Sequence, residues 1–212
     1  MSKIAIIDYG MGNLRSVHKA VEHVAPEHEV IVTSDAQVVA AADRVVFPGQ
    51  GAMPDCMREL ELRGLREAVI AASASKPFLG ICIGEQMLFG HSEEGDVPGL
   101  GVLPGNVQRF RDAVMKDAAG NALKVPHMGW NGVNQSKSHP LWNGIPHGER
   151  FYFVHSFHVV PADTDLIAAT TDYGVSFTSA VARDNIFAVQ FHPEKSAQAG
   201  LKLLANFVGW QP

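Results

Sequence analysis

The sequence predicts an α/β fold, with a mostly parallel, doubly wound sheet, helices on both faces and a partly antiparallel second half. In the first ~90 residues, short apolar runs alternate with segments of helical spacing, which is the order that builds a parallel sheet with crossover helices. After residue 105, β-type runs follow one another with tight-turn signals between them, such as the Asn-Gly pair in NGIPHG at 143–148. The two halves therefore predict different strand arrangements.

Apolar runs and helical periodicity predict the elements of the first half. The run KIAIID at residues 3–8 lacks strict alternation, so we expect a strand that is buried on both faces. Residues 56–74 carry the amphipathic pattern of one long helix, which Gly64 weakens. Further strands are predicted at 28–33, 44–49 and 77–82, and further helices at 13–24, at 36–42 and from 84 onward.

The second half is predicted to be rich in short strands. Runs of β-type residues occupy 106–110, 151–160, 165–171, 176–184 and 185–194. The triplet RDN at 183–185 is typical of a hairpin turn, and a helix is expected at 197–210. No repeat, low-complexity segment or flexible linker interrupts the sequence, so we expect a single domain that spans residues 1–212.

Composition indicates a globular protein of ordinary charge. The 212 residues carry a net charge of -5 and 46% of them are hydrophobic, which argues against a disordered chain. No basic cluster indicates a nucleic-acid partner, and no apolar run approaches the ~18 residues of a membrane span. The two cysteines make no disulfide framework and the N-terminal apolar run is too short for a signal peptide, so we expect a cytoplasmic protein.

Cys82 stands where the predicted fourth strand turns into a helix, inside the pattern G-x-C-x-G at 80–84. This is the cysteine form of the nucleophile elbow, in which glycines permit a sharp turn that projects the nucleophile above the sheet edge. The helix N-terminus favours a thiolate, and the N–H of Ile83 would point to where an oxyanion forms. The alternative is a structural thiol, since free cysteine is among the most buried residue types.

A candidate base for Cys82 lies in FAVQFHPEKS at 187–196. His192 falls at the end of a predicted strand, and Pro193 fixes the backbone between it and Glu194. The carboxylate could hold one imidazole nitrogen and leave the other free for the thiol, which is the logic of nucleophile, base and orienting group. The alternative is a surface turn without a role, and with 10 histidines in the chain only the combination with Cys82 favours catalysis.

The segment FPGQGAMPD at 47–55 follows the predicted third strand. Because neighbouring parallel strands end side by side, we expect this loop to lie next to Cys82. Its N–H groups could then supply a second oxyanion donor, and loss of one such donor typically lowers the rate by ~10²–10³. The alternative is a plain turn between a strand and a helix.

Together, the elbow, the HPE segment and the PG-x-G loop resemble the class I glutamine amidotransferases over essentially the whole chain. Five segments are similar to those of one branch, the glutaminase subunits of imidazole glycerol phosphate synthases, which act in histidine biosynthesis. These segments are DYGMGNLRSV at 8–17, HSEEG at 91–95, PHMGWN at 126–131, FYFVHSF at 151–157 and HPEKS at 192–196.

The resemblance implies a role for each matching residue. Cys82 attacks the side-chain amide of glutamine, His192 transfers protons, and Glu194 orients His192. The implied oxyanion hole is formed by the N–H groups near Gln50 and Ile83. The implied contacts with glutamine come from Gly49, Gly51, Gln86, Glu94, Ser156 and Phe157.

The resemblance implies neither a cofactor nor a metal. The ammonia passes to a separate (β/α)₈ cyclase subunit, which uses it to make imidazole glycerol phosphate and an aminoimidazole carboxamide ribonucleotide. The implied contacts with that partner come from Asn13, His127, Met128, Trp130 and Lys195.

Two residues depart from the family pattern. Glu85 stands where methionine is common, and Gln50 stands where valine is common. Near the third position of the helix, Glu85 could bond back to the cap N–H. A negative charge aimed at the sulfur would disfavour the thiolate, so we expect Glu85 to point away from Cys82, toward solvent or the partner.

Other functions stay open at this point. The same chemistry could serve another acceptor, or a catalytically silent chain could use the fold to bind and regulate a partner. A dinucleotide site at GMGN is disfavoured because Arg15 stands where the third glycine is required. His155 and His158 would face opposite ways on one strand, which disfavours a shared metal site.

Overall fold

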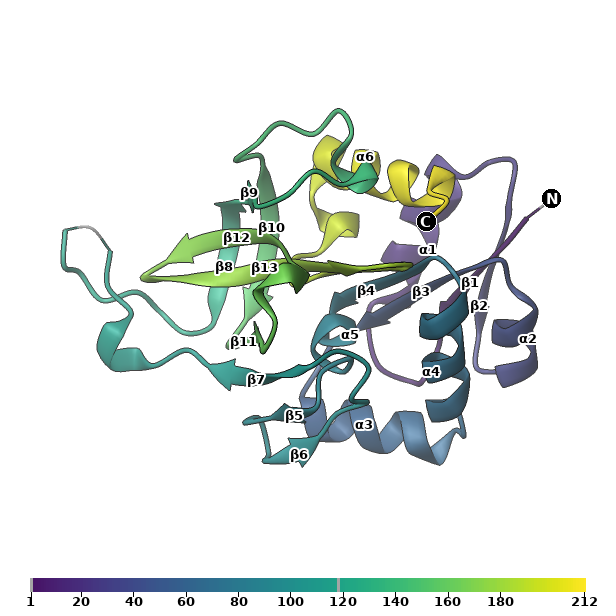
Figure 1. Cartoon of the computed structure of the whole chain (residues 1–212), viewed down its shortest axis with the longest axis horizontal. Coiled ribbons are helices and arrows are strands. Elements are labelled where there is room, and N and C mark those ends of the chain that lie inside the picture. Colours follow the sequence, from purple (N-terminus) through teal and green to yellow (C-terminus); the bar gives the residue numbers. More distant parts are fainter. Residues whose placement is uncertain (1, 118) are drawn as a thin grey trace.

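The fold is organised around a mixed eight-stranded sheet (Figure 1). The computed structural model describes residues 2–117 and 119–212 of the chain, and the strand order within them is β2-β1-β3-β4-β14-β13-β12-β9. In this order the strands are β2 (Glu29–Thr33), β1 (Lys3–Ile7), β3 (Arg44–Gly49), β4 (Phe78–Cys82), β14 (Ile186–Val189), β13 (Val175–Arg183), β12 (Ile167–Tyr173) and β9 (Asn134–Gln135). The first five run parallel and the last three pair antiparallel, which confirms the predicted fold class.

The parallel strands form the centre of the core. Residues 4–7 of β1 and all of β4 are buried, as expected for apolar runs without alternation. Large side chains from neighbouring strands pack together, with the ring centroids of Phe47 and Phe78 5.9 Å apart. This layer holds the ends of β3, β4 and β14 in fixed relation to one another.

Helices cover both faces of the sheet (Figure 1). They are α1 (Leu14–Val24), α2 (Ala36–Ala41), α3 (Met53–Leu62), α4 (Arg66–Ser75), α5 (Ile83–Gln86) and α6 (Ala197–Gly209). The helices α1 and α6 pack together on one face, and α2 packs with α4 on the other. Asn13 caps α1, since its side-chain oxygen accepts the N–H of Ser16 at 3.4 Å.

Pairing between β4 and β14 brings the two halves of the chain together. Gly80 lies opposite Ala188, and Ile81 lies opposite Val189. A Cβ atom at Gly80 would lie 2.9 Å from the Cβ of Ala188, so only glycine allows the strands this approach. The segments that follow the two strands therefore lie at the same edge of the sheet.

The prediction of one long helix over 56–74 is wrong. The chain forms α3 and α4 instead, and the break lies at Gly64, whose φ of +66° is in the left-handed region. The N–H of Leu65 donates to the carbonyl of Leu60 at 3.1 Å, which is the bond that ends helices at such a glycine. The helix expected from residue 84 is also shorter than predicted, because α5 is a single turn.

Two smaller sheets complete the second half. The strands β8 (His127–Gly132) and β10 (Arg150–His155) form an antiparallel pair. The other sheet has the order β11-β7-β5-β6 and consists of β11 (Phe157–Pro161), β7 (Gly105–Arg109), β5 (His91–Ser92) and β6 (Val97–Pro98). The hairpin predicted at RDN is confirmed, since Arg183 of β13 pairs with Ile186 of β14.

The single strand expected over 151–160 is divided at Ser156 between these two sheets. His155 and His158 consequently both pack against the ring of Phe110, with centroid distances of 5.2 and 4.8 Å. The expectation that they face opposite ways is therefore wrong. No group of three metal-ligating side chains occurs among the residues that the structure describes.

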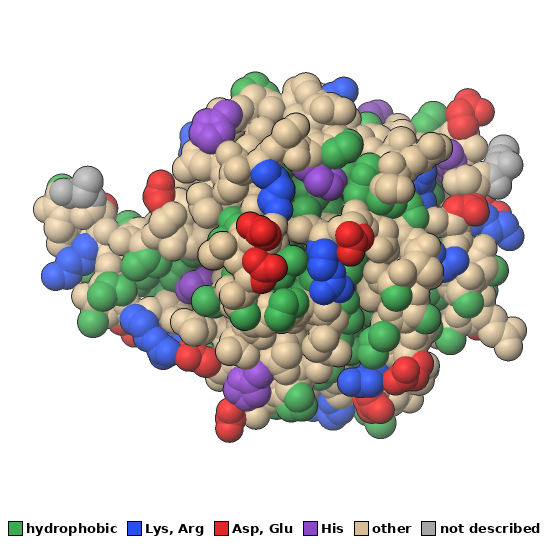
Figure 2. Space-filling view, in the orientation of Figure 1, with side chains coloured by type: hydrophobic (Ala, Val, Ile, Leu, Met, Phe, Trp, Pro, Cys, Tyr) green, Lys and Arg blue, Asp and Glu red, His purple; other side chains and the backbone are tan. Residues whose placement is uncertain are grey.

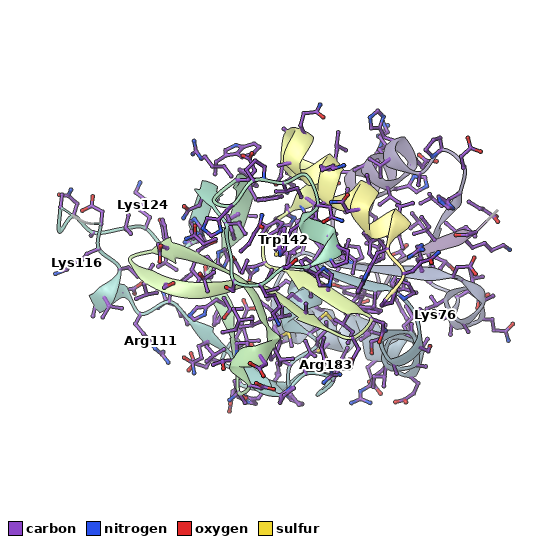
Figure 3. All side chains as sticks on the ribbon, turned by 45° about the horizontal axis from the view of Figure 1, so that its top comes forward. Lys76, Arg111, Lys116, Lys124, Trp142 and Arg183 are labelled. Atoms are coloured by element: carbon purple, nitrogen blue, oxygen red, sulfur yellow. The ribbon has the colours of Figure 1, made fainter. Side chains whose placement is uncertain are left out.

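The surface carries charges of both signs. Lys, Arg, Asp and Glu side chains are interspersed on the face shown in Figure 2. Between β7 and β8, Lys116 and Lys124 lie on a part of the chain that extends outward from the body (Figure 3). Within residues 2–117 and 119–212, no helix is long and apolar enough to span a membrane.

Candidate active site

Cys82 lies at a strained elbow between β4 and α5. Its φ of 56° and ψ of -114° are unusual for a residue with a side chain. A Cβ atom at Gly84 would lie 1.9 Å from the carbonyl oxygen of Phe47, so this glycine lets α5 start directly against β3. Ile83 begins α5, and N–H groups in the first turn of a helix have no acceptor within it. The elbow predicted from G-x-C-x-G is confirmed.

His192 and Glu194 form a buried pair in the segment that follows β14. Nδ1 of His192 lies 2.8 Å from Oε1 of Glu194, and the two side chains are 4% and 2% exposed. Nε2 of His192 has no hydrogen-bond partner among the described residues, which leaves it free toward the pocket that His192 shares with Cys82. The carboxylate therefore orients the ring as the spacing predicts.

The charge of His192 depends on its neighbours. Burial lowers the pKa of His192, but the negative charges of Cys82 and Glu194 and the hydrogen bond that His192 donates to Glu194 together raise it to about 10. The ring is therefore an imidazolium near neutral pH. A cation of this kind beside Cys82 favours a thiolate and can give a proton to a leaving group.

A pocket of about 320 Å³ opens above the elbow. Its lining contains most residues that the sequence suggested for the site: Gln50, Gly51, Cys82, Ile83, Gln86, Glu94, Ser156, Phe157 and His192. Pro126, Val154 and His155 also line it, and sequence reasoning did not assign them to it. Gly49 is not one of the lining residues, and a Cβ atom there would meet the hydroxyl of Tyr9 at 2.3 Å.

The loop of Gln50 lies beside Cys82, as predicted. In the register of β3 and β4, Gly49 is directly opposite Cys82. Gly51 has a φ of +117°, and the thiol of Cys56 donates to the carbonyl of Gln50 at 3.8 Å. Cys56 is buried, as expected for a structural thiol, and burial raises its pKa to about 11.

Two buried amides connect the pocket wall to the sulfur. Nε2 of Gln86 donates to the carbonyl of Phe157 at 3.2 Å and to Oε1 of Gln190 at 2.8 Å. Nε2 of Gln190 in turn donates to the sulfur of Cys82 at 3.7 Å. Sequence reasoning did not identify Gln190. Its place two residues before His192, directly after a fully apolar strand, was the available signal.

Glu94 reaches the pocket from the loop after β5. Its Oε2 atom accepts the N–H of Met53, the first residue of α3, at 2.8 Å. Burial raises the pKa of this half-buried carboxyl, and the hydrogen bond from Met53 opposes that effect. When ionised, Glu94 offers a negative charge in the pocket lining, where a cationic group could bind.

The geometry agrees with comparisons to known proteins. The family described as glutamine amidotransferase class-I matches residues 5–209. This chain belongs to that family.

Relatives of the amidotransferase chain extend over its whole length. It is 76% identical over 212 residues to the imidazole glycerol phosphate synthase subunit HisH of Aromatoleum aromaticum, covering 100% of both chains. It is 70% identical over 209 residues to the subunit of the same name from Dechloromonas aromatica, covering 99% of this chain and 97% of the relative. A crystal structure of a glutamine amidotransferase has a TM-score of 0.70 at 17% identity, covering 97% of both chains, which shows the shared fold.

The prediction that Glu85 of the amidotransferase points toward solvent or a partner is wrong. Glu85 is 0% exposed, and neither carboxylate oxygen has a hydrogen-bond partner within the described part of the chain. The bond back to the helix cap is therefore absent. The helix α5 is a single turn, and all four of its residues are buried, so it leaves no exposed face for Glu85. Burial, with the charge of Cys82, raises the pKa of Glu85 well above its usual value and so favours the protonated carboxyl.

The residues suggested for a partner surface divide into two groups. Asn13, Met128 and Trp130 are exposed, the last two at 62% and 44%. Lys195 lies with its Nζ 6.0 Å from the ring centroid of Tyr152, which also neighbours Trp130. The side chains of Asn13, Met128 and Trp130 are therefore open to another molecule, and Lys195 is half-buried beside them.

His127 differs from that group, because its side chain is buried and 3% exposed. The expectation that it contacts a partner directly conflicts with this position. Alternation along β8 turns Met128 and Trp130 outward and His127 inward, where its ring stacks on Tyr173 at 3.9 Å and Phe153 at 4.9 Å. Any influence on a partner would have to pass through its neighbours.

Proposed function

We propose that this chain hydrolyses glutamine to glutamate and ammonia as the glutaminase subunit of an imidazole glycerol phosphate synthase in histidine biosynthesis. The observation that carries the proposal is Cys82, held at a strained elbow in the same pocket as the buried His192–Glu194 pair. The identity to two relatives named as subunits of that synthase supports the choice among class I glutaminases.

In the first half of the reaction, the thiolate of Cys82 attacks the side-chain carbonyl carbon of glutamine. The N–H groups of Ile83 and of the Gln50 loop donate to the oxyanion that forms. His192 starts as an imidazolium and gives its proton to the amide nitrogen, so that ammonia leaves as the C–N bond breaks. A thioester on Cys82 remains.

In the second half, neutral His192 takes a proton from water as the water attacks the thioester. The tetrahedral intermediate collapses, the C–S bond breaks, and its electron pair returns to the sulfur of Cys82. Glutamate leaves, and the thiolate and imidazolium are restored. Each step uses water, the substrate or a group of this chain, so the proposed reaction requires no cofactor and no metal.

The pocket suits glutamine as a ligand. Glu94 would bind the α-ammonium group, since it carries the carboxylate that lines the pocket beside Gly51. Gln86, with the backbone of Ser156 and Phe157, would hold the remaining polar atoms, and Gly49 lies opposite Cys82 in the neighbouring strand. The substrate is thereby placed with its side-chain amide toward Cys82.

The proposed partner is a cyclase subunit that receives the ammonia. The exposed apolar side chains of Met128 and Trp130, together with Lys195 and Asn13, form the surface that we assign to it. Aromatic residues and methionine are enriched at protein interfaces, which favours Trp130 and Met128 as the apolar part of this surface. We place the single-domain subunit in the cytoplasm, because Cys56 and Cys82 are both free thiols, as expected in a reducing compartment.

Glutamate release tests this proposal. Purified chain is mixed with a purified cyclase subunit and its ligand, and glutamate is measured with and without the partner. Stimulation by the partner supports the synthase assignment. Glutaminase activity that no cyclase alters would leave the family chemistry but remove this partner, in favour of a synthase with another acceptor.

A catalytically silent regulatory partner is the other candidate function. A diazoketone analogue of glutamine distinguishes the two, because it alkylates an active thiol in a glutamine pocket. We expect one adduct at Cys82, found by mass spectrometry of the digested protein. Absence of an adduct with the partner present would contradict the enzyme function.

A further inference from the structure

Gln190 occupies a fully buried position between the nucleophile and the pocket wall. It follows β14 directly, is 0% exposed, and its backbone N–H donates to the carbonyl of Ser179 on β13 at 3.0 Å. Its side-chain amide contacts two groups. Oε1 of Gln190 lies 2.8 Å from Nε2 of Gln86, and Nε2 of Gln190 lies 3.7 Å from the sulfur of Cys82. A buried amide held at both ends has one orientation.

A backbone carbonyl determines that orientation. The oxygen of Phe157 can only accept hydrogen bonds, so the Gln86 atom that faces it must be the donor Nε2. The same Nε2 also faces Gln190, which must therefore present its acceptor Oε1 to Gln86. The remaining end of the Gln190 amide, its Nε2 donor, is then turned to Cys82.

The reversed arrangement is unfavourable at each contact. If Gln86 were flipped, its oxygen would face the Phe157 carbonyl, and if Gln190 alone were flipped, two NH₂ groups of buried side chains would face each other. The carbonyl of Phe157 therefore fixes the orientation of the Gln86 amide, which in turn fixes Gln190 with its N–H directed at the sulfur of Cys82. Nothing in the proposed reaction uses this N–H so far.

We propose that Gln190 is a further catalytic residue, whose side-chain N–H donates to the sulfur of Cys82 whenever that sulfur carries negative charge. This inference deepens the proposed glutaminase function. The N–H stabilises the thiolate before attack, loses a good acceptor while the sulfur is bonded to the acyl carbon, and regains it when the C–S bond breaks and the electron pair returns to sulfur. It thus assists both formation and departure of the thiolate.

The size of the effect follows from hydrogen bonds to ions. A bond from a neutral donor to a charged acceptor contributes roughly 1.5–3 kcal/mol, which corresponds to about a 10- to 100-fold change in the thiolate population at a given pH. Sulfur is a weaker acceptor than oxygen and the contact is 3.7 Å, so we expect the lower end of that range.

The test is the rate of alkylation of Cys82 by iodoacetamide as a function of pH. Gln190→Met keeps length and volume but removes the donor, and Gln190→Leu is the second variant. We expect the midpoint of the pH profile to move upward by about one pH unit, with the plateau at high pH within about twofold of that of the unsubstituted chain. Gln135→Met is the matched control, since Gln135 hydrogen-bonds the carbonyl of Ile145 outside the pocket.

The two readouts separate catalysis from structure. A loosened pocket would change the plateau rate and leave the midpoint in place, whereas a lost donor moves the midpoint. Unchanged midpoints in both Gln190 variants, with native circular dichroism, would overturn the inference. Iodoacetamide needs no glutamine turnover, so this result is independent of whether the proposed glutaminase function holds.

Discussion

Nδ1 of His127 lies 3.0 Å from Nε2 of His155, and this contact joins the strand β8 to the wall of the pocket. The carbonyl of Phe157 lies 2.7 Å from Nδ1 of His155 and can only accept, so Nδ1 of His155 carries the proton. Burial lowers the pKa of His127 to about 4 and that of His155 well below its usual value. Both rings are neutral near pH 7. Nδ1 of His127 therefore donates to Nε2 of His155, and Nδ1 of His155 donates to the carbonyl of Phe157 in the pocket wall.

Replacement of His127 tests this connection. In His127→Phe the stacking on Tyr173 is kept, but Nε2 of His155 loses its donor, which costs about 1–3 kcal/mol of stability. Because His155 supports the Phe157 backbone in the pocket, we expect KM for glutamine to rise roughly tenfold, with a smaller change in kcat, in a glutamate-release assay. His147→Ala, at an exposed histidine, should alter neither constant.

The buried carboxyl of Glu85 makes stability depend on pH. Its pKa is higher in the folded than in the unfolded chain, so the folded state keeps a proton that the unfolded state releases above about pH 4.5. Stability from this group is therefore complete at low pH and declines as pH rises toward the folded pKa. We expect Glu85→Met to stabilise the protein by about 1–3 kcal/mol at pH 8 and by much less at pH 4.

Urea unfolding at the two pH values measures this difference. Glu67→Met is the control, because the side chain of Glu67 is 83% exposed and its loss should change stability by no more than about 0.5 kcal/mol. If Glu85→Met raised the free energy of unfolding equally at both pH values, the folded chain would not raise the pKa of Glu85, which contradicts the prediction.

The charge on Cys82 controls the titration of His192. In the intact site the pKa of His192 is raised to about 10, so its contribution to stability is present below its usual pKa of 6.5 and is lost as pH rises through 10. Cys82→Ser removes the thiolate, so we expect the His192 resonance to titrate at distinctly lower pH. NMR of the imidazole carbons measures this, and an unshifted resonance would contradict a thiolate–imidazolium pair.

Two glycine substitutions separate steric exclusion from backbone strain. At Gly84 a Cβ atom would lie 1.9 Å from the carbonyl oxygen of Phe47, so Gly84→Ala must displace α5 from β3 and should cost roughly 3 kcal/mol or more, with loss of activity. At Gly64 an added Cβ atom would meet no atom of the described residues within 4 Å beyond its neighbours in the chain, and only the φ of +66° opposes alanine, at about 1 kcal/mol. Thermal unfolding of both variants should show this order, and similar melting temperatures would refute it.

Much of the fold and the site could be predicted because the signals are local. The elbow requires glycines on both sides of Cys82, and the HPE segment fixes His192 against Glu194, so short stretches of sequence specify these geometries. The place of the Gln50 loop beside Cys82 follows from the general rule that neighbouring parallel strands end side by side, whereas the pairing of β4 with β14 was not predicted.

The predictions failed at residues whose conformation or burial depends on contacts between distant parts of the chain. Gly64 ended a helix because the chain adopts a left-handed turn there, although the apolar periodicity continues across it. Glu85 is charged in isolation, yet α5 is too short to offer an exposed face, and packing buried it. Gln190 lies inside FAVQFHPEKS, but its role depends on Gln86 and Cys82, which only the fold brings to it from elsewhere in the chain.

Because β14 pairs with β4, the groups of the active site come from segments that the ribosome synthesises at different times. Cys82 is synthesised 108 residues before Gln190, and His192 comes two residues after that. At roughly 5–20 residues per second, on the order of ten seconds pass between the synthesis of Cys82 and that of Gln190 and His192, the groups that favour its thiolate. An incomplete chain therefore lacks the base and the orienting group of the proposed reaction, and a truncated product that stops before residue 190 would release no ammonia however well its first half folded.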